Sequence, residues 1–219
     1  GLTEFGPGNV IYHEGRKYRV DGVVLPPAGI EERFRRARLC NECGYAHDEE
    51  AVTVDLCEHC GTWLDAATSE FPQRLLLQPS VRTRGVERIS SDEEERVRSG
   101  YITTTHFRFA PGVNRRHAQG IDADGTPVLD VLYAPAATIW RINHGWRRGD
   151  HNGFQIDPQT GRWQRRDVDA ALGEDDNPDI ARPLAGVKPF VTDSRNLLLI
   201  RPPGETISDD LLITLLYAI

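Results

Sequence analysis

Apolar and polar residues alternate along several short segments of this chain, and the 3.6-residue period of a helix is rare. The clearest case is residues 101–109, where one set of alternate positions is Tyr101, Thr103, Thr105, Phe107 and Phe109. A period of two places alternate side chains on opposite faces of an extended segment. The pattern therefore predicts a half-buried strand at residues 101–109.

Turn residues join other alternating segments into predicted hairpins. The turns are Glu14-Gly15, Asp124-Gly125 and residues 157–161, and Asp-Gly is a preferred two-residue hairpin turn. The segments that they join are 10–13 with 17–24, 119–121 with 128–133, and 154–156 with 162–165. Two more predicted strands cover residues 137–143 and 197–200.

Signals for helices are few. Ser91 and Glu94 form a capping box, which predicts a helix of about two turns ending near Gly100. Residues 208–210 resemble a second helix start, and residues 30–38 read as a short charged helix or turn. The acidic residues 167–179 read as a surface loop or linker. Together the patterns predict a β-rich α+β fold with an inserted four-cysteine, zinc-ribbon-like module.

Composition narrows the class of protein. The chain has 219 residues, 39% of them hydrophobic, and a formal net charge of -7. The apolar fraction suffices for a folded core, and the negative charge argues against non-specific coating of nucleic acid. No apolar run reaches the length of a membrane span and no secretory signal opens the chain, so we expect a cytoplasmic protein without a membrane partner. The absence of methionine, with an apolar run to Ile219, suggests a piece of a longer protein.

The four cysteines carry the most specific signal. Cys40 and Cys43 form one Cys-x2-Cys pair, Cys57 and Cys60 form another, and thirteen residues separate the pairs. A glycine follows each pair and permits a tight turn that directs both sulfurs to one point. Four thiolates make a closed tetrahedral site, so the spacing predicts one structural Zn²⁺.

Alternatives to zinc are two disulfides, four free thiols or a rubredoxin-like iron site. Disulfides require an oxidising compartment, and rubredoxin-like iron sites usually separate their pairs by a longer stretch. We expect residues 48–56 to form a hairpin between the two cysteine turns, with Trp63 packed against it. His47 and His59 are spare because four ligands fill the shell, and we expect His59 to face solvent.

One stretch has the composition of a nucleic-acid interface. Arginines can pair with phosphates while tryptophan rings stack on bases. The candidate residues are Arg141, Asn143, Trp146, Arg147 and Arg148. The alternative is a strand with a buried Trp140 and solvated arginines, and the residues alone slightly favour it.

Two further groups remain open. Arg33, Arg35, Arg36 and Arg38 form a second basic cluster with the same two interpretations. No phosphate-binding loop, His-Glu-x-x-His or Gly-x-Ser-x-Gly motif occurs, so no catalytic residue is assigned. A hydrolase that uses His106 or His144 with Asp193 is the weakest alternative.

The order of several blocks resembles a known family. The blocks are residues 4–9 with Tyr12 and 15–18, residues 90–96 with Gly100-Tyr101, residues 143–147, and residues 193–198 with the apolar end of the chain. They are similar to the zinc-binding C-terminal domain of MrfA-type DEAD/DEAH-box helicases and to the DrmB subunit of the DISARM anti-phage system. The resemblance covers nearly the whole chain.

The resemblance implies an accessory domain that supports DNA binding or remodelling by a superfamily-two helicase, in repair or phage defence. ATP would then bind only to a motor in the same polypeptide or in a partner subunit. We divide the chain into an N-terminal hairpin region (1–39), a zinc ribbon (40–64) and a β-rich accessory domain (65–219). The alternative function is a scaffold that binds a helicase partner without contacting DNA.

Overall fold

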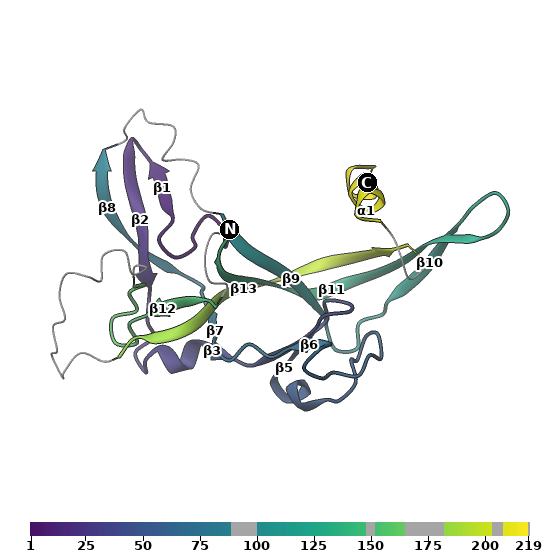
Figure 1. Cartoon of the computed structure of the whole chain (residues 1–219), viewed down its shortest axis with the longest axis horizontal. Helices are drawn as coiled ribbons and strands as arrows, with labels where there is room; N and C mark the ends of the chain where they lie inside the picture. Colours follow the sequence, from purple (N-terminus) through teal and green to yellow (C-terminus); the bar gives the residue numbers. More distant parts are fainter. Residues whose placement is uncertain (89–99, 148–151, 165–181, 203–207, 219) are drawn as a thin grey trace. The chain divides into compact units, whose positions relative to one another are not determined.

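The computed structural model describes residues 1–88, 100–147, 152–164, 182–202 and 208–218 (Figure 1). The chain forms two compact units. The first comprises Gly1–Phe107 and Ile139–Asp193, and the second comprises Arg108–Thr138 and Ser194–Ile219.

Strands dominate both units. The strands are β1 Val10–His13, β2 Arg16–Val23, β3 Phe34–Arg35, β4 Ala37–Cys40, β5 Ala46–Asp48, β6 Ser69–Glu70, β7 Leu75–Leu77, β8 Val81–Arg88, β9 Tyr101–Phe109, β10 Arg116–Ile121, β11 Pro127–Trp146, β12 Phe154–Ile156 and β13 Leu184–Arg201. The helices are the 3₁₀ helices η1 Ile30–Arg33 and η2 Glu49–Thr53, and the α-helix α1 Asp209–Ala218.

The first unit contains three sets of paired strands. An antiparallel sheet has the order β1-β2-β8, and a smaller one has the order β5-β4-β6. In the third set β7 lies between β13 and β3, parallel to β13 and antiparallel to β3. Lys188 pairs with Leu75 in this ladder, so residues far apart in the sequence become neighbours.

Strand β7 is buried on both faces, which explains its unbroken leucine sequence. Leu75 is fully buried in a cluster that contains Trp140 and Phe190, whose rings stack with centroids 4.8 Å apart. Leu76 belongs to a second buried cluster. The other buried members of this cluster are Val23, Ile30, Ile156 and Val187. The core of the first unit therefore lies on the two sides of β7.

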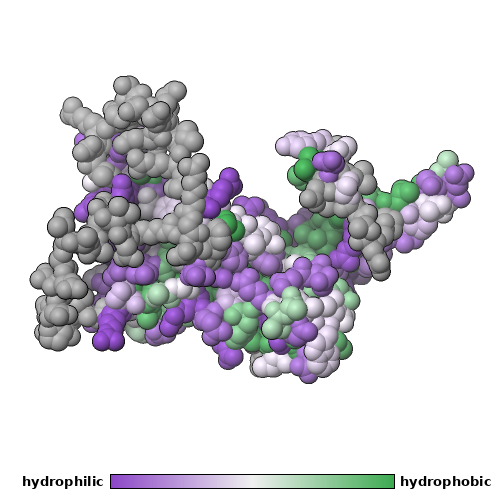
Figure 2. Space-filling view, in the orientation of Figure 1, coloured by the Kyte–Doolittle hydropathy of each residue, from purple (hydrophilic) through white to green (hydrophobic). Residues whose placement is uncertain are grey.

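The second unit is built on the antiparallel pair β10 and β11. The turn between them places Gly125 at φ 82°, and Asp122 accepts hydrogen bonds from the backbone of Asp124 and Thr126. Ile121 and Val128 remain exposed on this hairpin. Figure 2 shows apolar green atoms interrupting the hydrophilic surface of the hairpin, at the right of the view.

The main fold predictions are confirmed. The chain is β-rich with a four-cysteine cluster, and each of the three predicted hairpins forms. Val10 pairs with Arg19 in the first hairpin, and Ile156 bridges Trp163 in the third. A strand covers residues 101–109, and α1 occupies the apolar end of the chain. The functional division at residues 39 and 64 stays a prediction.

Several predicted elements have different bounds in the structure. Residues 128–133 and 137–143 are extended as predicted but belong to the single strand β11, and the predicted strand at residues 197–200 is part of the longer strand β13. Pro135 does not break β11, because the fixed φ of proline is compatible with an extended backbone. Residues 30–38 are helical only over η1 and then continue as β3 and β4.

The expected hairpin over residues 48–56 is wrong, because the segment closes into the 3₁₀ helix η2. The amide of Val54 donates to the carbonyl of Ala51 at 3.3 Å, and this hydrogen bond ends the helix. The helical turn buries Val52, which an exposed hairpin between the cysteine pairs would not do. The predicted helix at 91–100 and the acidic loop at 167–179 lie outside the described residues, apart from Gly100. No helix in the described ranges has the length and apolarity to cross a membrane.

Candidate metal centre and its surroundings

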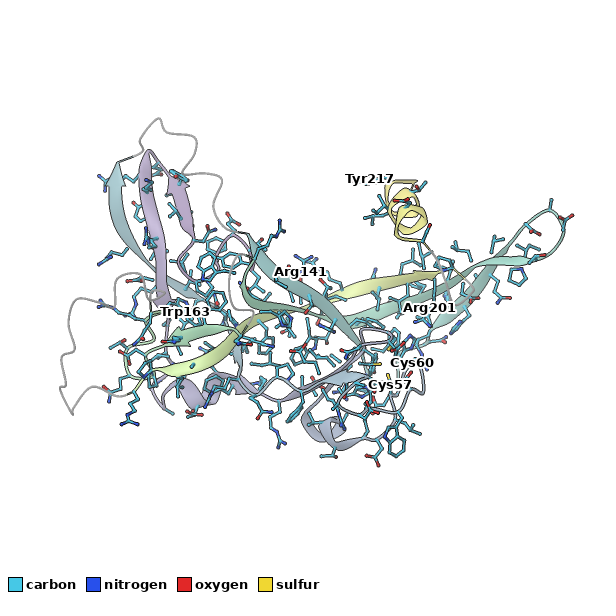
Figure 3. The ribbon with its side chains drawn as sticks, in the orientation of Figure 1. Cys57, Cys60, Arg141, Trp163, Arg201 and Tyr217 are labelled. Carbon is cyan, nitrogen blue, oxygen red and sulfur yellow. The ribbon has the colours of Figure 1, made fainter. Side chains whose placement is uncertain are left out.

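The four cysteine sulfurs converge on one point. Cys40 Sγ lies 3.7 Å from Cys60 Sγ, Cys43 Sγ lies 3.6 Å from Cys57 Sγ, and all four sulfurs lie within 4.8 Å of one another. A disulfide bond would require about 2.05 Å. Four sulfurs at about 2.3 Å from one ion in a tetrahedron are roughly 3.8 Å apart. The cluster therefore has the dimensions of a tetrahedral metal site. Figure 3 labels two of its members, Cys57 and Cys60.

Two backbone turns of the same geometry present the sulfurs. In each turn a glycine amide donates to the carbonyl of the first cysteine at 2.9 Å, Gly44 to Cys40 and Gly61 to Cys57. The two glycines have φ values of 75° and 74°, in the left-handed region that favours glycine. The sequence signal of a glycine after each cysteine pair is thus a backbone requirement.

The electrostatic environment differs among the four thiols. Burial raises the pKa of Cys43 and of Cys57, since a thiolate loses hydration there. Burial has the same effect on Cys60, but hydrogen bonds from Thr62 and the neighbouring sulfurs outweigh it and lower its pKa to about 7. Cys60 Sγ lies 3.2 Å from Thr62 Oγ1. A cation at the centre would supply the positive charge that the buried thiolates require.

Aromatic rings line one side of the centre. His59 packs edge-on against Phe107 at 5.4 Å between ring centroids and lies 5.8 Å from Tyr45. His59 was expected to face solvent, and these contacts leave it half-buried. Trp63 forms a bridge with Leu56 but remains 58% exposed, so most of its ring is not packed as expected. His47 is fully buried.

A polar network, which the sequence analysis did not detect, lies in the same unit. Lys188 Nζ is 2.6 Å from Glu70 Oε1, and His144 Nδ1 is 3.7 Å from the same oxygen. On its other side, His144 Nε2 lies 2.7 Å from the Thr104 hydroxyl, which is 2.9 Å from His106 Nε2. Glu70 and Lys188 are 118 positions apart, so no local sequence pattern connects them.

The contacts favour one order of donors in the network. The Glu70 carboxylate favours a proton on His144 Nδ1, which leaves His144 Nε2 as an acceptor. The single proton of the Thr104 hydroxyl then points to His144, and Thr104 accepts from His106 Nε2–H. Burial lowers the pKa of both histidines, so both imidazoles are neutral near pH 7. The acid facing His144 is Glu70, whereas the hydrolase alternative, the weakest from the sequence, combined His106 or His144 with Asp193.

The nucleic-acid candidates occupy different environments. Arg141 and Arg147 are exposed on β11 and at its end. Asn143 is fully buried, and its Oδ1 accepts from the amide of Gly145 at 3.1 Å. Trp146 is half-buried and stacks on Tyr101, with centroids 4.7 Å apart. Arg148 lies outside the described residues. A nucleic-acid role for these five residues stays a prediction.

The surroundings of Arg147 show how it is held. Its amide donates to the Gly100 carbonyl at 2.6 Å. A Cβ on Gly100 would lie 3.4 Å from the guanidinium carbon of Arg147, so the side chain lies against this glycine. The guanidinium is thus kept close to the backbone while it stays exposed.

Comparison with known proteins identifies no relative: no family model, no curated protein and no solved structure matches the chain.

Proposed function

We propose that the chain is a zinc-binding accessory module that supports a superfamily-two DNA helicase, in DNA repair or in defence against phage. Zinc is the ion that four thiolates in a closed tetrahedral shell most often bind, and such a shell leaves no position for a substrate. The metal centre is then structural, and the ATP-dependent motor lies elsewhere, in the same polypeptide or in a partner.

The burial of Trp140 matches the alternative of a core strand with solvated arginines. The DNA-binding part of this proposal therefore rests on one observation, the exposure of two arginines on and beside this strand. Strand β11 buries Trp140, Ile142 and Asn143 while it exposes the guanidinium of Arg141 (Figure 3), and Arg147 is exposed at the end of the strand. Exposed guanidiniums on a rigid, well-packed strand can contact phosphates without a large loss of side-chain freedom. The resemblance of residues 143–147 to a block of the helicase family supports the same interpretation.

The test is DNA binding by the zinc-loaded chain as a function of salt concentration. Arg141→Gln with Arg147→Gln should reduce the slope of log affinity against log salt by about 1.4 for single strands, at about 0.7 for each lost phosphate contact. Arg84→Gln is the matched control, because Arg84 is also exposed but lies on β8. An unchanged slope in the double variant would reject these contacts.

A scaffold is the second candidate function, and α1 favours it. The exposed residues of this helix include Leu216, 74% exposed, and Tyr217, 86% exposed (Figure 3). Ile213 is also exposed, and spacings of three and four residues place these side chains on one face of the helix. If the chain bound a helicase subunit but no DNA, and Leu216→Ser abolished that binding, the scaffold would replace the DNA-binding function.

A further inference from the structure

A second cationic surface lies where the chain enters and leaves the cysteine module. Strands β3 and β7 pair antiparallel, with Phe34 opposite Leu76 and Arg35 opposite Leu75. Arg36 follows β3 and Arg74 precedes β7, so both lie at the same end of this short ladder. Pairing thus adds an arginine that is distant in the sequence to the basic cluster before Cys40.

Backbone carbonyls hold two of these guanidiniums. Arg35 Nη1 donates to the carbonyls of Glu32 at 2.8 Å and Phe34 at 2.9 Å. Arg74 Nη1 donates to the carbonyl of Ala185 at 2.9 Å. Across the described parts of the chain, no carboxylate lies within 4.0 Å of Arg35, Arg36 or Arg74. Carbonyls therefore position Arg35 and Arg74, and no described carboxylate pairs with either guanidinium.

An exposed aromatic ring accompanies the charges. The guanidinium carbon of Arg36 lies 5.6 Å from the centroid of the Phe71 ring, and Phe71 is 38% exposed. This cation–π contact with Arg36 helps to fix the orientation of the Phe71 ring. Arginines on a phosphate track, with an aromatic ring for stacking, are the components of single-strand binding grooves.

The pairing of β4 with β6 brings the two halves of this surface together. Arg36 lies four residues before Cys40, and Phe71 follows β6, which pairs with β4 through Cys40 and Ser69. The two halves of the surface are thus the two ends of one loop, which the β4–β6 pairing closes and which contains the cysteine cluster.

We propose that Arg35, Arg36, Arg74 and Phe71 form a binding site for single-stranded nucleic acid. The arginines contact consecutive backbone phosphates, and one base stacks on the Phe71 ring. This inference rests on the proposed function only in taking nucleic acid as the partner. The site itself is separate in sequence from the Arg141 and Arg147 contacts.

The experiment titrates the zinc-loaded full chain with fluorescein-labelled oligothymidine over a series of salt concentrations. Arg36→Gln with Arg74→Gln should lower the slope of log affinity against log salt by about 1.4. Phe71→Leu keeps an apolar side chain but removes the aromatic face, so affinity should fall between about fivefold and about a hundredfold. Arg84→Gln is the control, and every variant is checked for unchanged zinc content and melting temperature.

The outcomes separate this inference from the proposed function. Reduced slopes for Arg36→Gln with Arg74→Gln and weaker binding for Phe71→Leu support the site. Loss of binding only through Arg141→Gln with Arg147→Gln supports the proposed function and overturns this inference. Binding of a poly-glutamate peptide with equal affinity, unaffected by Phe71→Leu, also overturns it, because the surface would then select polyanions rather than bases. Absence of any oligothymidine binding by the parent chain overturns both.

Discussion

Gly44 and Gly61 occupy the same position in two turns of nearly identical backbone conformation. Their φ values are 75° and 74°, and each amide donates to a cysteine carbonyl four residues earlier at 2.9 Å. The Cys40 amide in turn donates to the Tyr45 carbonyl at 2.9 Å, and the Cys57 amide to the Thr62 carbonyl at 2.8 Å. The four-cysteine cluster is therefore built from two copies of one local structure.

Gly61→Ala should destabilise the cysteine module by backbone strain alone. No atom lies within 4 Å of the added Cβ, so the cost is that of a left-handed alanine, about 1–2 kcal/mol. Urea unfolding at saturating zinc measures the change.

The matched control is Gly85→Ala in β8. This glycine also has open space around the added Cβ, but its φ is not in the left-handed region. Alanine there restricts the unfolded chain and should raise stability by up to about 1 kcal/mol. Equal effects of the two substitutions would show that the positive φ of Gly61 does not contribute.

Stability should decrease as the pH falls through the titration of His144. Burial is the main cause that lowers the pKa of His144, and Lys188 and His106 add to this effect, although Glu70 opposes it. The folded chain keeps this imidazole neutral where an unfolded histidine, with a pKa of about 6.5, takes up a proton. The unfolded state then binds more protons, so the free energy of unfolding falls as the pH decreases below about 6.5.

Urea unfolding of the parent chain and of His144→Gln measures this dependence, with zinc content monitored at each pH. Glutamine retains an oxygen that can accept from the Thr104 hydroxyl. The loss of stability on acidification should be smaller in His144→Gln than in the parent. An identical loss in both chains would assign the dependence to other groups.

Glu70 and Lys188 should shift the pKa of His144 in opposite directions. Glu70 raises this pKa and Lys188 lowers it. Lys188→Met should therefore raise the His144 pKa, and Glu70→Gln should lower it further. NMR titration of the imidazole ring protons reports both shifts, and an unchanged pKa in the two variants would contradict the 3.7 Å contact between His144 and Glu70.

Local signals predicted local structure well. Asp124-Gly125 located a hairpin turn, because its backbone requirement is local, and the cysteine spacing located all four sulfurs of the cluster. The predicted strands at residues 128–133 and 137–143, in contrast, are parts of one long strand. Alternation in each segment showed an extended backbone but not that the strand continues between them.

Contacts between distant segments could not be predicted. The parallel pairing of Lys188 with Leu75 and the contact between Arg36 and Phe71 depend on how strands assemble, and periodicity does not encode this. The same holds for Trp146, since its stacking on Tyr101 is a tertiary contact that a basic and aromatic composition cannot distinguish from base stacking.

Elemental analysis of the full chain, purified without chelator, tests the central claim that the four cysteines hold one structural zinc ion. We expect about one zinc per chain in the parent and loss of the zinc in Cys57→Ser. We also expect the variant to lose the ordered structure of residues 40–64. The apparent free energy of zinc binding at such sites is about 10–16 kcal/mol, and it contributes directly to folding. A parent chain that contains no zinc, or iron in its place, would contradict the account.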